Sequence, residues 1–182
     1  MGGPALVIEL PSPATATDRS PAVPPVPGIE YSPLTFEAIS GLPERGVMCV
    51  GWGGEIWLLD HGKWMREDSP TNMILTCIVP SPSGQVYLLG QAGTVLVGQP
   101  GKWATLPQVI EENLWSATWF DGALHACSSQ QLFVMDGDEL CSVGLPENPE
   151  TFYSLSVKDD AMLSTGARDV LLLLPDRMER IV

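Results

Sequence analysis

Few residues in this 182-residue chain are suited to chemistry. It has two histidines, His61 and His125, and four cysteines. His125 and Cys127 are two residues apart, so on a strand their side chains share one face, a spacing that suits a metal pair. No second pair of ligands stands near them in the sequence. We therefore expect His125 and Cys127 to form a buried structural pair.

Catalytic motifs are also missing from the sequence. The turn at 136–139, Asp-Gly-Asp-Glu, resembles part of a calcium loop but lacks its full spacing. Neither a Gly-rich phosphate loop nor a Gly-x-Ser-x-Gly elbow occurs. Carboxylates are plentiful, yet nothing singles out the pair that glycoside hydrolysis needs. The sequence predicts no catalytic residue, no cofactor and no metal, and hence a protein that is not an enzyme.

The charge balance narrows the choice of partner. The 22 acidic residues outnumber nine basic ones, for a formal net charge of -13. This field repels phosphate backbones and anionic membrane surfaces, which argues against nucleic acid and membrane as partners. It attracts a basic protein and speeds its approach. An acidic surface also serves solubility alone.

Two features of the sequence favour a cytoplasmic protein. The first ten residues, MGGPALVIEL, carry no basic residue before a short apolar run, unlike a secretory signal. Three of the four cysteines lie inside apolar runs, where a free thiol behaves as a small hydrophobic group. We expect reduced cysteines.

The strongest signal is an internal repeat. Residues 50–64 read VGWGGEIWLLDHGKW, and residues 89–103 read LGQAGTVLVGQPGKW. Two glycines of the first turn and the closing Gly-Lys-Trp coincide without a gap. Weaker copies occupy 132–140 and 170–178, where Leu140 and Met178 replace the tryptophan. A fixed period in this size range indicates a repeat architecture.

Each copy breaks into four short apolar runs separated by turn residues. In the second copy the runs are 74–79, 85–89, 94–97 and 102–106, and in the third a tight hairpin is expected at Asp121-Gly122. Segment 108–115 has room for one helical turn at most. The predicted fold class is all-β and β-propeller-like, with four blades of four antiparallel strands. The predicted blades cover approximately 33–68, 69–108, 109–148 and 149–182.

The turn and tryptophan pattern resembles the blade repeats of photosystem-assembly-factor-like and sialidase-like proteins. In those repeats a Val-x-x-Gly-x-x-Gly-x-Ile/Val hairpin leads to a Trp at the start of the last strand. Residues 89–103 match best, 50–64 match second, and the resemblance covers roughly 34–182. It implies a propeller built from such blades.

Four blades allow two arrangements. A complete last strand in the fourth copy favours a ring that closes within one chain. The alternative is a half-ring with two exposed apolar blade faces, completed by a second copy in a homodimer.

The first 32 residues differ in composition. Seven prolines alternate there with Ala, Ser and Thr, so we expect an extended, flexible segment that forms neither sheet nor helix. The run 5–10 is an exception and could add as a strand to a sheet edge.

One rim of the predicted propeller is the favoured binding surface. It carries the turn between the second and third strands of each blade and the link to the next blade. Both rims are acidic, but this one also offers an exposed aromatic side chain and a long link, and aromatic residues are enriched at binding hot spots. Trp115 and Trp119, by contrast, are expected to pack between blades. The predicted partner-binding residues are Trp52, Glu55, Glu67, Asp68, Gln91, Glu111, Glu112 and Asp169.

These observations favour a non-enzymatic propeller that binds a basic protein. An inhibitor that neutralises a toxin, of the bacterial immunity type, fits the size, the charge and the lack of catalytic residues. A structural or assembly scaffold tethered by the Pro-rich segment is the first alternative, and a degenerate carbohydrate-active propeller is the second. Fold alone does not choose among them.

Overall fold

Four antiparallel sheets of four strands each make up the protein in its computed structural model, which describes residues 8–9, 17–18, 35–43, 45–145 and 149–181. Strands follow one another within each sheet in chain order, as expected for propeller blades. Blade 1 contains β3 (Phe36–Leu42), β4 (Gly46–Gly51), β5 (Ile56–Asp60) and β6 (Lys63–Arg66). Blade 2 contains β7 (Leu75–Pro80), β8 (Val86–Gly90), β9 (Val95–Gln99) and β10 (Lys102–Thr105). Blade 3 contains β11 (Ser116–Phe120), β12 (Ala123–Cys127), β13 (Leu132–Asp136) and β14 (Glu139–Ser142), and blade 4 contains β15 (Ser154–Lys158), β16 (Ala161–Thr165), β17 (Val170–Leu174) and β18 (Arg177–Arg180).

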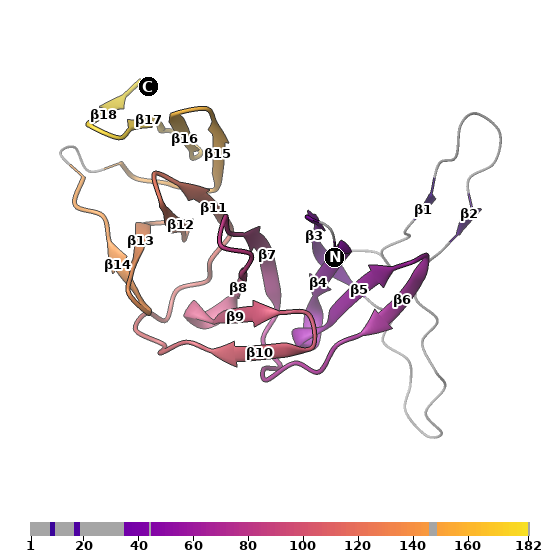
Figure 1. Ribbon diagram of the computed structural model, residues 1–182. Coiled ribbons are helices and arrows are strands. Elements are labelled where there is room, and N and C mark those ends of the chain that lie inside the picture. Colours follow the sequence, from indigo (N-terminus) through magenta and orange to yellow (C-terminus); the bar gives the residue numbers. More distant parts are fainter. Residues whose placement is uncertain (1–7, 10–16, 19–34, 44, 146–148, 182) are drawn as a thin grey trace.

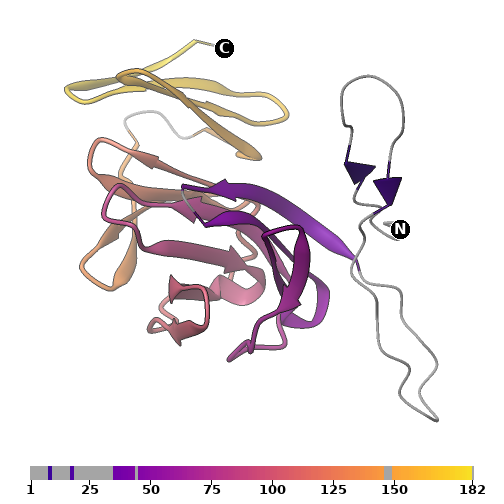
Figure 2. The same cartoon turned by 45° about the vertical axis from the view of Figure 1, so that its right-hand side comes forward.

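The blades follow an open arc, with blade 1 at one end and blade 4 at the other (Figures 1 and 2). The first strand of each blade is innermost, because β3 lies against β7, β7 against β11, and β11 against β15. The predicted all-β, four-bladed architecture is confirmed. Within the part of the chain that the structure describes, the blades form a partial ring rather than a closed one.

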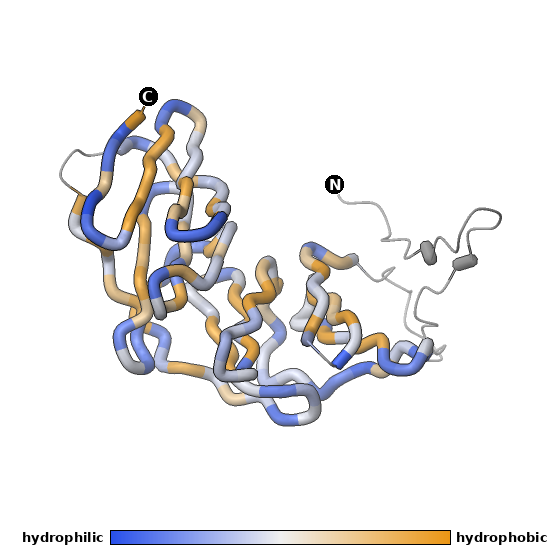
Figure 3. Tube along the Cα trace, turned by 45° about the horizontal axis from the view of Figure 1, so that its top comes forward, coloured by the Kyte–Doolittle hydropathy of each residue, from blue (hydrophilic) through white to orange (hydrophobic). Residues whose placement is uncertain are grey.

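The core consists of three apolar clusters, one between each pair of neighbouring blades. Met48, Ile56 and Leu58 of blade 1 pack against Leu88 and Leu96 of blade 2. A second cluster joins blades 2 and 3, and a third joins blades 3 and 4. Apolar stretches run along the strands, while many turns are hydrophilic (Figure 3). Blade-to-blade burial is thus the main apolar contribution to stability.

Close backbone contacts explain the glycines that repeat between blades 1 and 2. A Cβ on Gly51 would lie 2.0 Å from the Thr35 carbonyl oxygen, and one on Gly90 would lie 2.0 Å from that of Ile74. The turns continue as short 3-10 segments, Trp52–Gly54 and Gln91–Gly93. The sequence did not predict these segments, and 108–115 forms no helical turn.

The inner hairpin between β11 and β12 and the outer hairpins of blades 1 and 2 also follow the predicted turn chemistry. Asp121 and Gly122 have φ values of 45° and 77°, as a tight hairpin requires. The glycine of each Gly-Lys-Trp motif also has positive φ, 77° at Gly62 and 82° at Gly101. Glycine adopts positive φ at no steric cost because it has no Cβ.

The predicted Pro-rich segment 1–32 lies mostly outside the described residues. Its described part is a small antiparallel sheet in which β1 (Ile8–Glu9) pairs with β2 (Thr17–Asp18). The expectation that this segment forms no sheet is therefore wrong for Thr17 and Asp18, whereas Ile8 and Glu9 lie in the run 5–10, for which a strand at a sheet edge was expected. None of the four is a proline, so each can donate a backbone hydrogen bond. No helix in the described ranges is both long and apolar enough to cross a membrane.

Candidate protein-binding rim

One edge of the arc gathers the second-to-third-strand turns and the links between blades. The blade 2 turn contacts the following link directly, because the Gly93 amide donates to the Glu112 carbonyl at 2.7 Å. The Ala92 amide donates to Asn113 Oδ1 at 3.0 Å, and Gln108 Nε2 donates to the Ala92 carbonyl at 2.6 Å. We call this edge the first rim. It comprises residues 52–55, 67–74, 91–94, 106–115, 128–131, 143–145, 149–153 and 166–169.

Exposed large hydrophobic side chains concentrate on the first rim. Among the described residues, the other exposed ones are Ile39, Met65 and Leu163 on strands and Ile181 after β18, so the opposite rim carries none. Isolated exposed apolar residues are ordinary, but several on one edge mark an interaction surface. Those on the first rim are Trp52, Met73, Val109, Trp115 and Tyr153.

Trp52 lies in the blade 1 turn with 52% of its surface exposed. Its indole nitrogen donates to Glu37 Oε1 at 2.5 Å, which fixes the ring while leaving its apolar area open to solvent. Because the ring is held before any partner arrives, binding would cost less side-chain entropy. The prediction of an exposed Trp52 on this rim agrees with the structure.

Trp115 and Tyr153 occupy equivalent places in blades 3 and 4. Each lies one residue before the innermost strand, and each donates its backbone amide to the end of the second strand, at Cys127 and Thr165 respectively. Their exposed fractions are 48% and 50%. The expectation that Trp115 packs between blades is wrong, because the residue precedes β11.

The same expectation is right for Trp119. It packs on the cluster between blades 2 and 3, with its ring centroid 6.0 Å from that of Tyr87. Trp119 lies within β11, where side chains alternate between the two faces of the blade.

Two of the predicted acidic contacts are used inside the molecule. Glu55 accepts from Trp57 Nε1 at 2.8 Å and from Arg66 at 2.7 Å. Glu67 accepts from the Gly101 amide and from Trp103 Nε1, so it ties blade 1 to the outer hairpin of blade 2. Both carboxylates therefore already make hydrogen bonds within the molecule, and these contacts stabilise the blades.

The remaining predicted residues differ in accessibility. Asp68 and Glu111 are exposed, while Gln91 and Glu112 are half-buried. The backbone of Gln91 donates to Ile74 and accepts from Thr94, so its place in the turn is fixed. Asp68, Glu111 and Trp52 are the predicted residues that a partner can reach most readily.

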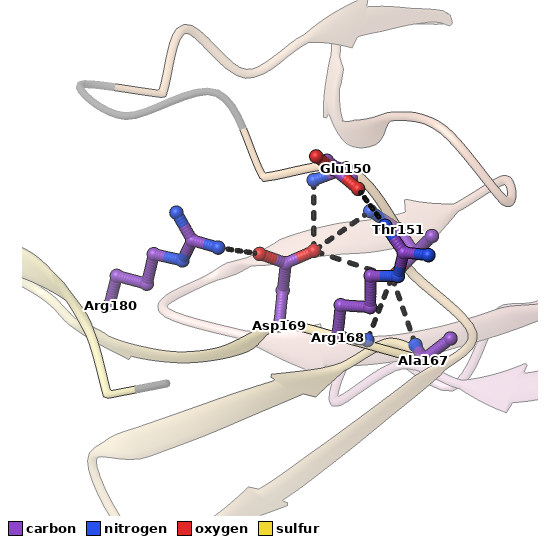
Figure 4. Close-up of polar contacts among 6 residues, drawn as sticks. All are labelled: Glu150, Thr151, Ala167, Arg168, Asp169 and Arg180. Atoms are coloured by element: carbon purple, nitrogen blue, oxygen red, sulfur yellow. Dashed lines mark hydrogen bonds and ion pairs between the residues drawn. The ribbon is translucent and has the colours of Figure 1, made fainter.

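Asp169 is buried, with 2% of its surface exposed, so its predicted role in partner binding is wrong. Its Oδ2 accepts from the backbone amides of Glu150 at 2.8 Å and Thr151 at 3.0 Å, and from the Thr151 hydroxyl at 3.3 Å (Figure 4). Its Oδ1 forms an ion pair with Arg180 at 2.5 Å. Burial by itself would raise the pKa of Asp169, but these hydrogen bonds and the Arg180 charge outweigh it and lower the pKa.

Of the expected buried pair on β12, Cys127 is fully buried and His125 is half-buried. The His125 ring stands edge-on to Phe120 with centroids 5.5 Å apart, and desolvation lowers its pKa despite contact with the Ala123 carbonyl. Burial raises the pKa of the Cys127 thiol to about 12. In the described part of the chain, no three His, Cys, Asp or Glu side chains gather in a metal-binding arrangement.

Comparison with known proteins places this geometry in context. No protein-family model matches the chain. It is 42% identical over 137 residues, 74% of its length, to immune protein Tsi7 of Pseudomonas aeruginosa, and the match covers 45% of Tsi7. The chain therefore spans about half the length of this curated relative.

Two solved structures share the fold. Virginiamycin B lyase from Staphylococcus aureus matches with a TM-score of 0.69 and 12% identity, over 80% of this chain and 55% of the lyase. The WD40 β-propeller domain of Doa1 matches with a TM-score of 0.57 and 13% identity, over 80% of this chain and 53% of that chain. Likeness at this identity establishes the propeller fold and nothing about activity.

Proposed function

We propose that this protein is a non-enzymatic immunity-type protein that neutralises a toxic protein by binding it. The observation that carries the proposal is the 42% identity to an immune protein over 137 residues. The first rim supports it independently, because it combines exposed aromatic side chains with carboxylates on a fixed scaffold.

The first rim supplies what a protein interface needs at its centre. Trp52, Trp115 and Tyr153 present large rigid apolar surfaces, and such side chains dominate measured binding energies. Asp68 and Glu111 lie on the same rim and are exposed. They would pair with basic residues around an apolar contact.

The charge of the chain supports a basic partner. A formal net charge of -13 attracts a basic protein over distances comparable to the Debye length, about 8–10 Å at physiological salt. Added salt would slow the encounter between the two proteins and weaken the complex.

The test begins with capture from a native lysate of the source organism on the purified full chain, with washes at low and then high salt. The captured protein is then produced in a host with and without this chain. We expect a basic protein that stops growth alone and permits growth when the chain is present. A captured protein that is harmless, and whose retention is indifferent to salt, would favour the scaffold instead.

Rim variants connect the captured protein to the proposed surface. Trp52→Ala and Trp115→Ala should each weaken binding by about 2 kcal/mol or more, roughly thirtyfold, if they are hot spots. Met65→Ala is the matched control, because Met65 is comparably exposed but lies on the outer strand β6. Equal affinities for all three variants would move the binding surface away from the first rim.

A further inference from the structure

Each blade has a trailing face, toward the preceding blade, and a leading face, toward the next. The trailing face of blade 1 carries two rows of paired residues, Ile39–Cys49–Trp57 and Val47–Leu59–Trp64. None of these six residues belongs to the three clusters that join the blades. Ile39 is 62% exposed, Val47, Leu59 and Trp64 are half-buried, and Cys49 and Trp57 are buried.

The trailing face of blade 1 matches the trailing face of blade 2 position by position. Adding the repeat offset gives the rows Ile78–Leu88–Leu96 and Val86–Gly98–Trp103, in the same register. Five of these six residues belong to the cluster against blade 1, to which blade 2 also contributes Leu75. The trailing face of blade 1 is therefore constructed to dock on the leading face of another blade.

The opposite end of the arc offers such a leading face. On blade 4, Leu163 pairs with Leu172, and Thr165 with Val170, at the register places where blade 1 has Met48 with Leu58 and Val50 with Ile56. Those blade 1 residues contact blade 2. Leu163, Leu172 and Val170 belong to none of the three clusters, and Leu163 is 39% exposed.

The two tryptophans of the repeat also differ in a way that points to a missing neighbour. Trp103 Nε1 donates to Glu67 of the preceding blade at 3.3 Å. Trp64 Nε1, at the same place in blade 1, is buried and has no hydrogen-bond partner among the described residues. A buried unpaired donor is costly, and in blade 2 the preceding blade removes that cost.

We infer that two copies of this chain close an eight-bladed ring, with blade 4 of each copy docked on blade 1 of the other. The arc corresponds to 55% and 53% of the two solved chains, so a second copy supplies about the missing half. The aligned part of this chain covers 45% of Tsi7, so two such parts would approach the full length of that protein. Since a leading face always meets a trailing face, the two contacts are identical and the ring closes with twofold symmetry.

Added salt should strengthen the contact between the two copies, whereas it should weaken the binding of a basic partner. Each copy carries a formal charge of -13, so the copies repel one another and added salt strengthens their association. Apolar burial drives the contact itself. This inference does not depend on the proposed function, because the rim variants leave both end faces unchanged.

The test is the mass of the purified full chain by size-exclusion chromatography with light scattering. We expect twice the chain mass of 19.6 kDa, and a larger dimer fraction at higher salt. Ile39→Glu and Leu163→Glu should each give a 19.6 kDa species with an unchanged far-UV circular dichroism spectrum. Val109→Glu should remain dimeric, because Val109 lies on the first rim, and its exposed fraction of 46% falls between those of Leu163 and Ile39.

Several outcomes would overturn the inference, and the first needs no variant. A wild-type monomer at high protein concentration would mean that another part of the chain covers these faces. Dissociation by only one of the two face variants would indicate a like-to-like contact at one end of the arc. Assemblies that grow beyond the dimer would indicate a contact that does not close.

Discussion

The two halves of the arc hold the same turn in place by different chemistry. In blades 1 and 2, backbone lies directly against backbone at Gly51 and Gly90. In blade 4, a buried carboxylate on Asp169 gathers the amides of the entering segment and pairs with Arg180 on the outermost strand. Blade 1 has a related ion pair between Glu55 and Arg66, but the carboxylate of blade 4 is more deeply buried and also accepts hydrogen bonds from the entering backbone.

A glycine at the equivalent place in blade 4 shows how the second solution adds to the first. A Cβ on Gly166 would lie 2.0 Å from the Thr151 carbonyl oxygen, so the close approach is retained. The Thr151 hydroxyl accepts from the Ala167 amide at 2.9 Å, and Asp169 binds Thr151 from the other side. Blade 4 thus adds side-chain hydrogen bonds around the entering residue, whereas blades 1 and 2 combine the close approach with a backbone hydrogen bond to that residue.

The largest expected loss of stability follows from replacing the Asp169 carboxylate of blade 4. Asp169→Asn keeps the shape but replaces one oxygen with an NH₂ group, which must face either the Glu150 and Thr151 amides or Arg180, all of them donors. We expect the greatest fall in melting temperature of the substitutions discussed here, measured by circular dichroism at pH 7. Glu150→Gln is the control, because the exposed Glu150–Arg168 pair contributes at most about 1 kcal/mol.

The pH dependence of this effect has a definite sign. The pKa of Asp169 is lowered in the folded state, so its contribution to stability is full above the ordinary value of 3.8 and is lost as pH falls through the folded value. The gap in stability between wild type and Asp169→Asn should therefore narrow on acidification below about pH 4. A gap that stays constant down to the acid limit would mean that charge plays no part.

The second-largest loss of stability is expected for substitution of the closely packed glycines of blades 1 and 2. Gly90→Ala places a methyl group against the Ile74 backbone, and overpacking of this kind costs about 1–3 kcal/mol. Gly144→Ala, where no atom lies within 4 Å of the added carbon, is the control and should be nearly neutral. Urea unfolding of both variants measures the difference, and equal stabilities would show that the turn can shift without cost.

This contrast explains what the sequence could and could not reveal. Gly51 and Gly90 occupy the same place in two copies of the repeat, and this repetition revealed the blades in the sequence. Most predicted strands of blade 2 lie within two residues of the observed ones. Asp169 corresponds to Glu55 in blade 1 and to Thr94 in blade 2, because the carbonyls of these residues accept from Gly51 and Gly90 as that of Asp169 accepts from Gly166. The aspartate itself is not repeated, and its chemistry depends on contacts with residues 18 and 19 positions away. Sequence alone therefore treated it as one more acidic rim residue.

The binding surface was predicted in part for the same reason. Trp52 stands inside the repeat, so its turn and rim were evident. Trp115 and Tyr153 share a position one residue before an innermost strand, and that rule requires strand boundaries more exact than hydrophobic patterns provide. The sequence left a closed ring and a half-ring as alternatives and favoured the closed ring, because ring closure depends on blade twist rather than on residue identity.

The smallest expected changes in stability concern the two equivalent tryptophans of the repeat, Trp64 in blade 1 and Trp103 in blade 2. Trp103→Phe keeps the ring packing and removes the hydrogen bond to Glu67, which should cost about 1 kcal/mol. Trp64→Phe removes a donor that has no partner within the described arc, so in the monomeric Leu163→Glu background it should cost less than Trp103→Phe or raise stability. Urea unfolding in that background compares the two directly. An equal cost would show that a segment of the same chain already satisfies Trp64, whereas a cost that appears only in the wild-type background would show that the second copy supplies the acceptor.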